Sequence, residues 1–250
     1  MERIYLDHSA TTPLSDEVIA TLDQCNKKYY GNPASIHFYG QEARKLLEES
    51  RIHISSLINS PADNIIFTSC GSESNNMAIK GVAFSSAKKH IITSKIEHLS
   101  VLNTCKHLES IGYRISYLNV DNHGLIDISE LKDEICSDTS LISIQHVNNE
   151  TGIIQDIKKI GEITKGCGAT FHVDAVQSVG KIPVNIPSCN IDLLSASAHK
   201  INGPKGMGFL YINDSLAKMV PLIHGGPQEK NRRAGTINLP AVAAFAIAAK

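Results

Sequence analysis

An acid and a lysine follow two apolar segments in the second half of the chain. Asp174 comes directly after the apolar run at residues 171–173, and Lys200 ends the stretch Ser-Ala-Ser-Ala-His-Lys at residues 195–200, just before a glycine-rich turn. In an open α/β sheet, ligands bind at the carboxyl ends of the strands, so two such residues can face one site. Taken singly, Asp174 could be the cap of a turn and Lys200 an ordinary exposed lysine.

Together, these two residues suit the chemistry of pyridoxal 5'-phosphate. A lysine beside a buried strand can lose part of its hydration, which lowers the pKa of the amine and allows it to form a Schiff base. The cofactor also needs a carboxylate against its pyridine nitrogen, because the protonated ring accepts the electrons of a substrate carbanion. The pair therefore predicts pyridoxal phosphate on Lys200, with Asp174 at the ring nitrogen.

The phosphate of such a cofactor needs an anion site, which residues 68–76 (Thr-Ser-Cys-Gly-Ser-Glu-Ser-Asn-Asn) could provide. This stretch runs from an apolar segment into a predicted helix, so backbone N–H groups, a glycine and hydroxyl groups would face an anion. Ser197 and His199, beside Lys200, could add further donors. Other strand-to-helix turns have a similar composition, so this stretch predicts a phosphate site only in combination with the acid and the lysine.

The elements that position these residues are predicted from alternating apolar runs and amphipathic stretches. Strands are expected at residues 65–68, 90–93, 114–118, 140–146, 170–173 and 192–195. Helices are expected at residues 15–28, 41–57, 74–84, 99–110, 128–135, 157–165 and 239–250, with an irregular loop at 30–40. Strands and helices in series predict an α/β fold with a mostly parallel, doubly wound sheet. Near-continuous apolar strands indicate three layers, with helices on both faces of the sheet.

Composition narrows the class of partner. The 250 residues are 42% hydrophobic and 20% charged, and 24 basic and 25 acidic residues give a net charge of -1. No electrostatic attraction to nucleic acid or to an anionic membrane is expected, so small-molecule partners are favoured. The chain shows neither a signal-peptide core nor an apolar stretch of the roughly 20 residues that span a membrane, which predicts a cytoplasmic location. Six cysteines without a C-x-x-C pair predict reduced thiols and no metal site.

Beyond these residues, the sequence resembles the cysteine desulfurases, a pyridoxal-phosphate-dependent, class V aminotransferase-like family. The matching stretches run in family order and cover nearly the whole chain: residues 5–13, 31–37, 68–76, 97–98, 147–152, 172–180, 195–208 and 224–236. The resemblance implies the large domain of pyridoxal-phosphate fold type I. It also implies removal of sulfur from L-cysteine to give L-alanine and a persulfide, for iron–sulfur cluster assembly or tRNA thiolation.

The resemblance implies a role for each matching residue. Lys200 would carry the Schiff base, Asp174 would pair with the pyridine nitrogen, and His98 would stack on the ring, positioning it and transferring protons. Without the resemblance, His98 would be an ordinary histidine at the start of a helix. The other implied ligands are Gln177 at the phenolic oxygen, Asn149 near the cofactor and the substrate carboxylate, Gly71, Ser72, Ser197 and His199 at the phosphate, and Thr236 from a second subunit. Thr236 makes a homodimer part of the predicted site, although its own segment would also suit an exposed basic loop.

Two parts of a cysteine desulfurase are not found within these residues. The persulfide-forming cysteine of the family lies on a mobile loop beyond the Gly-Thr motif at residues 235–236, and the arginine that binds the substrate carboxylate follows the same motif. None of the six cysteines is assigned to catalysis, and Cys70 is interpreted as a buried small residue. A chain without the C-terminal small domain is therefore expected to show no sustained turnover of L-cysteine on its own.

The expected organisation is an N-terminal arm at residues 1–14 and a pyridoxal-phosphate-binding large domain at residues 15–250. Besides L-cysteine and a second copy of the chain, a sulfur-acceptor protein is the implied partner, either a scaffold or a tRNA-thiolation enzyme. Two alternatives stay open. One is another class V lyase or aminotransferase that uses the same lysine, acid and histidine, and the other is a dimerisation fragment without turnover.

Overall fold

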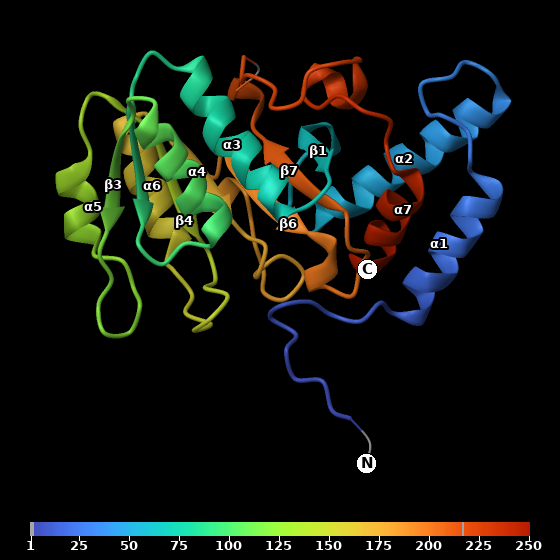
Figure 1. Ribbon diagram of the computed structural model, residues 1–250, viewed down its shortest axis with the longest axis horizontal. Helices are drawn as coiled ribbons and strands as arrows, with labels where there is room; N and C mark the ends of the chain where they lie inside the picture. Colours follow the sequence, from blue (N-terminus) through green and yellow to red (C-terminus); the bar gives the residue numbers. More distant parts are fainter. Residues whose placement is uncertain (1–2, 217) are drawn as a thin grey trace.

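The computed structural model describes residues 3–216 and 218–250, and its centre is a seven-stranded sheet (Figure 1). The strands are β1 (Ile65–Thr68), β2 (His90–Ser94), β3 (Arg114–Leu118), β4 (Thr139–Gln145), β5 (Thr170–Asp174), β6 (Leu193–Ser197) and β7 (Gly208–Ile212), in the order β1-β7-β6-β5-β4-β2-β3. Among these strands, β7 alone runs opposite to the other six, so its pairings with β1 and β6 are antiparallel and the remaining pairings are parallel. The predicted mostly parallel α/β sheet is confirmed, and β7 is a strand that the sequence pattern did not reveal.

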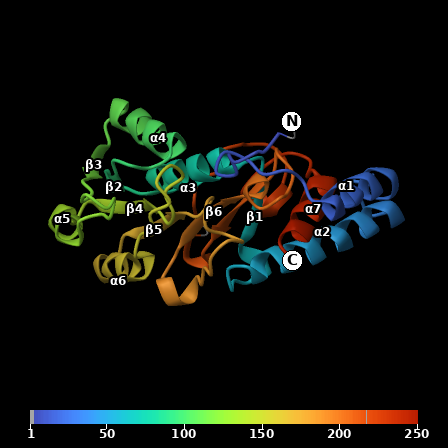
Figure 2. The same cartoon turned by 90° about the horizontal axis from the view of Figure 1, so that it is seen from below.

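Helices cover both faces of this sheet. They are α1 (Asp16–Lys28), α2 (Phe38–Ser56), α3 (Gly71–Ser85), α4 (Leu99–Ser110), α5 (Ile128–Glu134), α6 (Ile157–Cys167) and α7 (Leu239–Ala248). Figure 2 shows α3 and α4 on one side of the sheet and α6 on the other, with α1, α2 and α7 together at the β1 end. No helix in the described ranges is both long and apolar enough to cross a membrane. Residues 1 and 2 of the predicted arm lie outside the described residues.

The core has two parts because successive residues of a strand point to opposite faces. In β2, Ile91 packs in the cluster beneath α3 and α4, whereas Ile92 packs in the cluster beneath α2, α6 and α7. Leu193 and Leu194 divide in the same way in β6. Each of these side chains is fully buried, which stabilises the fold by about 1.5–3 kcal/mol for each side chain. This arrangement confirms the three layers expected from near-continuous apolar strands.

The helix starts show how local sequence places the later site. Ser15 is the N-cap of α1, where its Oγ accepts a hydrogen bond from the Val18 N–H at 3.3 Å. Helix α2 begins at Phe38, three residues before its predicted start, because His37 caps it and accepts from the Gly40 N–H. Helix α3 also begins earlier than predicted, at Gly71, directly after β1 and the cap residue Cys70. The first turn of α3 therefore lies at the carboxyl edge of the sheet.

Candidate active site at the carboxyl edge of the sheet

A cavity of about 520 Å³ lies at the carboxyl ends of the parallel strands. Its lining includes nearly all of the predicted site residues: Gly71, Ser72, His98, Asn149, Asp174, Gln177, Ser197, His199 and Lys200. Thr236 is exposed and does not line this cavity, and its expected contact was with a second subunit. The described chain thus brings together residues that are as much as 129 positions apart, from Gly71 to Lys200.

Lys200 lies in a short 3-10 helix, η3 (Ala198–Lys200), immediately after β6. Its amine donates hydrogen bonds to the backbone oxygens of Ser9 and Ala10, the latter at 2.8 Å. Burial lowers the pKa of the Lys200 amine, and the positive charge of Lys181 lowers it further. A lysine in this position carries its proton less firmly than an exposed lysine does, which favours nucleophilic attack by the neutral amine.

The N-terminal arm supplies the backbone oxygens that bind this lysine. Figure 1 shows the arm, in blue, passing below the sheet between the chain end and α1. Gln177 also holds the arm, because its Nε2 donates to the Ser9 backbone oxygen at 2.7 Å. The side chain of His199 contacts Thr11, with 3.1 Å between His199 Nδ1 and Thr11 Oγ1. Three predicted cofactor ligands therefore contact the arm, a set of contacts that no local motif in the sequence indicated.

Asp174 is the last residue of β5 and is only 6% exposed. Its Oδ1 accepts a hydrogen bond from the Val176 N–H at 3.0 Å, and its Oδ2 accepts one from Asn75 Nδ2 at 2.7 Å. Burial raises the pKa of Asp174 in spite of these two donors and of the nearby charges of His98 and Lys200. The hydrogen bonds and charges around Asp174 thus do not fully offset the cost of burying its negative charge. A cationic group in the cavity would stabilise this carboxylate further.

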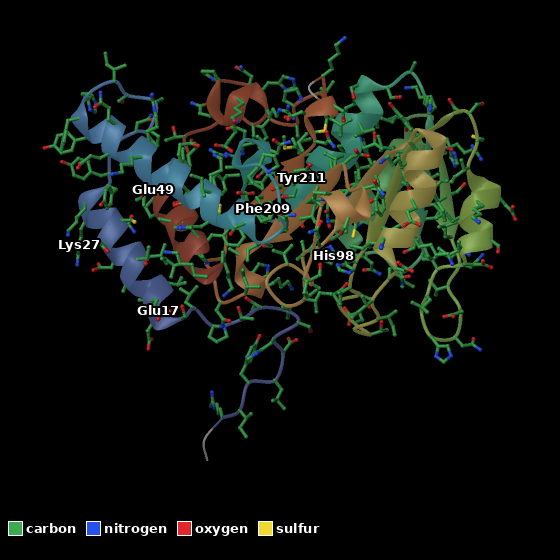
Figure 3. The ribbon with its side chains drawn as sticks, turned by 180° about the vertical axis from the view of Figure 1, so that it is seen from behind. Glu17, Lys27, Glu49, His98, Phe209 and Tyr211 are labelled. Atoms are coloured by element: carbon green, nitrogen blue, oxygen red, sulfur yellow. The ribbon has the colours of Figure 1, made fainter. Side chains whose placement is uncertain are left out.

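His98 is the N-cap of α4 and is exposed to solvent at the rim of the cavity. In Figure 3, where it is labelled, His98 lies at the loop edge of the sheet. Its Nδ1 accepts a hydrogen bond from the Ser100 N–H at 3.1 Å and lies 2.7 Å from Ser100 Oγ. His98 can therefore have both of the roles considered from the sequence. One ring nitrogen caps helix α4, and the ring itself lines the cavity.

The start of α3 has the features of an anion site. The first N–H groups of a helix have no partner within it, and here they belong to Gly71 and Ser72. A Cβ at Gly71 would lie 2.6 Å from Val176 Cγ2, so any larger residue would require the Val176 side chain to shift. Glu73 is in the same turn, but its carboxylate is paired with Arg233 at 2.8 Å. Burial opposes ionisation of Glu73, and the hydrogen bonds from Arg233 and Ser69 outweigh it and lower the pKa.

Cys70 is not the buried small residue that we expected from the sequence. It is partly exposed and lines the cavity. As the N-cap of α3, its Sγ accepts a hydrogen bond from the Glu73 N–H at 3.4 Å. Cysteine is outside the usual set of capping residues, which is why its position just before the helix did not reveal this role.

The cavity also contains polar residues to which the sequence analysis gave no role. Asn75, Ser100 and Gln145 all line it. Beneath them lies Glu97, which is 5% exposed and accepts hydrogen bonds from the Gln145 N–H at 3.0 Å and the Ser94 hydroxyl at 2.6 Å. Asn75 could have been identified from the sequence as a polar residue on the buried face of a predicted helix.

Comparison with known proteins gives a consistent result. The sequence profile described as "Aminotransferase class-V" matches residues 4–250. Cysteine desulfurase IscS of Dictyoglomus turgidum is 53% identical over 96% of this chain and 61% of that protein. Putative cysteine desulfurase IscS 1 of Bacillus subtilis is 46% identical over 97% of this chain and 64% of that protein. A solved structure of SspA in complex with cysteine superposes with a TM-score of 0.96 at 40% identity, covering 99% of this chain and 72% of that one.

The three-layer fold and the lysine and carboxylate at one sheet edge define an α/β domain of the kind found in pyridoxal-phosphate-dependent enzymes. The chain belongs to the aminotransferase class-V family. Members of this family, including the cysteine desulfurases, depend on pyridoxal phosphate. The chain spans 61% and 64% of the length of the two curated relatives named above.

Proposed function

We propose that this chain binds pyridoxal phosphate in the cavity at the carboxyl edge of the sheet. We further propose that it forms part of a cysteine desulfurase, which takes sulfur from L-cysteine and leaves L-alanine. The observation that carries the proposal is the joint presence of Lys200 and Asp174 in one cavity, each with its pKa shifted by burial. Perturbed ionisable groups that converge in a cleft are typical of catalytic sites. Strong similarity to proteins named cysteine desulfurase supports the reaction.

The residues present fit this cofactor. A cavity of about 520 Å³ is within the usual range for small-molecule sites. The carboxylate of Asp174 would be matched by a protonated ring nitrogen, which offsets the cost of its burial. The first turn of α3, with Gly71 close against Val176, offers backbone donors to a phosphate. When bound, pyridoxal phosphate would supply an electron sink for the carbanion formed at the substrate Cα.

The protein's own groups would bind and orient the reactants. Lys200, with its lowered pKa, would provide a neutral amine as nucleophile and later as proton acceptor. Burial and the adjacent charge of Lys200 lower the pKa of His199, so its neutral ring can donate one hydrogen bond to an anion. Gln177 is fixed from the other side, since its Oε1 accepts from Lys181 Nζ at 2.8 Å. Asn149 lines the same cavity, where its amide could contact a substrate carboxylate.

The finer features of the prediction belong to this proposal as well. We propose a homodimer in which Thr236 reaches the phosphate of the partner's cofactor. Its support is that Thr236 is exposed and does not line the cavity of its own chain. A sulfur-acceptor protein, a cytoplasmic location, and the division into an arm at residues 1–14 and a large domain at residues 15–250 are proposed with it. All six cysteines are unpaired, which suits a reducing compartment.

Substitution of Lys200 tests cofactor binding. Wild-type protein mixed with pyridoxal phosphate should gain a visible absorbance band that borohydride removes, and tryptic mass spectrometry should then find the reduced adduct on Lys200. We expect Lys200→Ala to give no such adduct, because the nearby amine is removed. Lys205→Ala, at an exposed lysine of the same glycine-rich turn, is the matched control and should label as wild type does. A reducible adduct of equal yield in Lys200→Ala would refute the assignment.

Formation of L-alanine from L-cysteine tests the reaction itself. We expect it from a polypeptide of the relatives' full length that contains this sequence, and we expect Lys200→Ala to abolish it in that polypeptide. Residues 1–250 alone should give no sustained L-alanine, since the family's loop cysteine is not among them. Continuous turnover by residues 1–250 would show that a thiol within them, such as Cys70 at the cavity, takes part.

A further inference from the structure

A continuous line of hydrogen bonds joins Asp174, expected at the ring nitrogen of the cofactor, to His98, expected to stack on the ring. Asn75 Nδ2 lies 2.7 Å from Asp174 Oδ2 and 2.8 Å from Ser100 Oγ. Ser100 Oγ in turn lies 2.7 Å from His98 Nδ1. All four side chains line the cavity. Asp174 and His98 are thus connected through two residues to which the family resemblance gave no role.

The direction of each hydrogen bond follows from the atoms involved. An asparagine amide nitrogen only donates, and its two hydrogens suffice for the Asp174 carboxylate and for Ser100 Oγ. The reversed amide would place Asn75 Oδ1 against the Asp174 carboxylate, acceptor against acceptor. Ser100 Oγ therefore accepts from Asn75, and its own hydrogen is available for His98 Nδ1.

His98 Nδ1 faces two polar groups of Ser100. The Ser100 backbone N–H donates to it at 3.1 Å, and the Ser100 hydroxyl, 2.7 Å away, can then donate its own hydrogen to the same nitrogen. A proton on Nδ1 would face the backbone N–H, a donor that cannot turn away, so the neutral ring carries its proton on Nε2. We propose that Asn75 and Ser100 are positioning residues that hold His98 as the Nε2–H tautomer and connect it to Asp174. This inference rests on the proposed function for its catalytic meaning, but the tautomer itself is a property of the chain.

The burial of Asn75 distinguishes this arrangement from simple helix capping. Capping of α4 requires only the contact between the Ser100 N–H and His98 Nδ1. It does not require Asn75, which is 1% exposed and whose Oδ1 is buried without a hydrogen-bond partner among the described residues. A buried asparagine with an unpaired oxygen lowers the stability of the fold. We therefore attribute its presence here to the two hydrogen bonds that it donates, to Asp174 and to Ser100.

The tautomer limits what His98 can do in the proposed reaction. With Nδ1 engaged by Ser100, the ring can donate a proton or a hydrogen bond from Nε2, but it offers no basic nitrogen to the cavity. Lys200, whose amine has a lowered pKa, is then the group that accepts a proton from the substrate. The structure thus assigns His98 to donation and Lys200 to acceptance.

Histidine side-chain NMR tests the inference directly in the protein without added cofactor. In long-range proton–nitrogen spectra of protein labelled with nitrogen-15 histidine, the His98 signals, identified by their absence in His98→Gln, should show the Nε2–H pattern. Asn75→Ala lets the Ser100 hydroxyl turn away from Nδ1. We expect the ratio of the two tautomers to fall by about two- to ten-fold, the effect of losing one ordinary hydrogen bond. Ser100→Ala should produce a shift in the same direction.

Conservative variants separate positioning from a general loss of structure. Ser100→Thr keeps a hydroxyl at the same carbon and should restore the wild-type tautomer pattern, whereas Asn76→Ala changes a neighbouring amide outside this line and should leave it unaltered. Circular dichroism checks that each variant is folded. A wild-type Nδ1–H pattern, or one that Asn75→Ala and Ser100→Ala both leave unchanged, would overturn the inference. The Lys200 labelling experiment fails or succeeds independently, so failure of the proposed function can be told apart from failure of this inference.

Discussion

Replacement of Glu229 with alanine is expected to lower the free energy of unfolding by about 3–5 kcal/mol. Glu229 and Arg51 form a bidentate ion pair with distances of 2.8 and 2.9 Å, and their side chains are 2% and 4% exposed. Glu229 also accepts a hydrogen bond from the Phe67 N–H at 2.7 Å. Burial alone would lower the pKa of Arg51, but the Glu229 carboxylate outweighs it and raises the pKa. Without that carboxylate, the buried guanidinium would keep only the Ile65 backbone oxygen and the half-exposed Glu48 carboxylate as partners.

The ion pair also holds a strained stretch of backbone around Glu229. Glu229, Lys230 and Asn231 have φ values of 44°, 58° and 62°, the left-handed region that residues with a Cβ rarely adopt. Each such residue costs about 1–3 kcal/mol and persists only where the surroundings hold it. Removal of the Glu229 side chain should let this segment relax, which would also displace the following segment that carries Thr236.

Urea unfolding followed by circular dichroism measures this loss. Asp63→Asn is the matched control, because Asp63 forms an ion pair with Lys230 of the same segment but is 83% exposed. Exposed pairs contribute about 0–1 kcal/mol, so this variant should stay close to wild type. An equal loss in the free energy of unfolding for Glu229→Ala and Asp63→Asn would show that the buried ion pair does not stabilise this segment.

Replacement of Glu97 with glutamine is expected to flatten the dependence of stability on pH. Burial raises the pKa of Glu97 to about 8, and the negative charge of Asp174 adds to the shift. The unfolded chain ionises this carboxyl near its ordinary pKa of about 4.3. The preference of the folded state for protonated Glu97 therefore stabilises the protein fully below about pH 4.3, and this stabilisation is lost progressively as the pH rises toward 8. The slope is about 1.4 kcal/mol per pH unit, for a total on the order of 4–5 kcal/mol.

Glutamine cannot ionise and keeps an oxygen for the two donors that Glu97 Oε1 accepts, so Glu97→Gln should be the more stable protein at pH 8. Denaturant midpoints measured at several pH values between 5 and 8 would show this. Burial lowers the pKa of His146 to about 4 and that of His172 to about 3, which favours folding above about pH 6.5 in both proteins. The difference between the two profiles therefore isolates Glu97. Parallel profiles would contradict a protonated Glu97, and Glu162→Gln, at an exposed position of α6, should match wild type throughout.

The sequence predicted the strands and helices well where periodicity was strong. The strands β1 and β3 and the helix α4 have the predicted bounds. The sequence pattern did not predict β7, because its short apolar run directly follows the glycine-rich turn of the lysine motif. Its antiparallel direction could not be predicted either, since it depends on a turn between β6 and β7 whose path no local pattern encodes.

The candidate site was predictable in part, for a physical reason. Residues at strand ends, such as Asp174 and Lys200, meet in any sheet of this type, and the family resemblance added the others. Asn75 and Ser100 reach the cavity because of the way helices α3 and α4 pack against the sheet, and local sequence does not determine that packing. Glu229 contacts Arg51 across 178 positions of the chain, and no spacing rule links such residues.

The contact between Lys200 and the N-terminal arm links two equilibria. The amine that donates to the backbone oxygens of Ser9 and Ala10 is the amine that the proposed cofactor would need. Under the proposed function, docking of the arm and attachment of the cofactor would compete for one group, and each would weaken the other by the same factor. The apparent affinity for the cofactor would then depend partly on the fraction of molecules in which the arm has released the lysine. Residues 3–14 would in that case act as an internal competitor for Lys200.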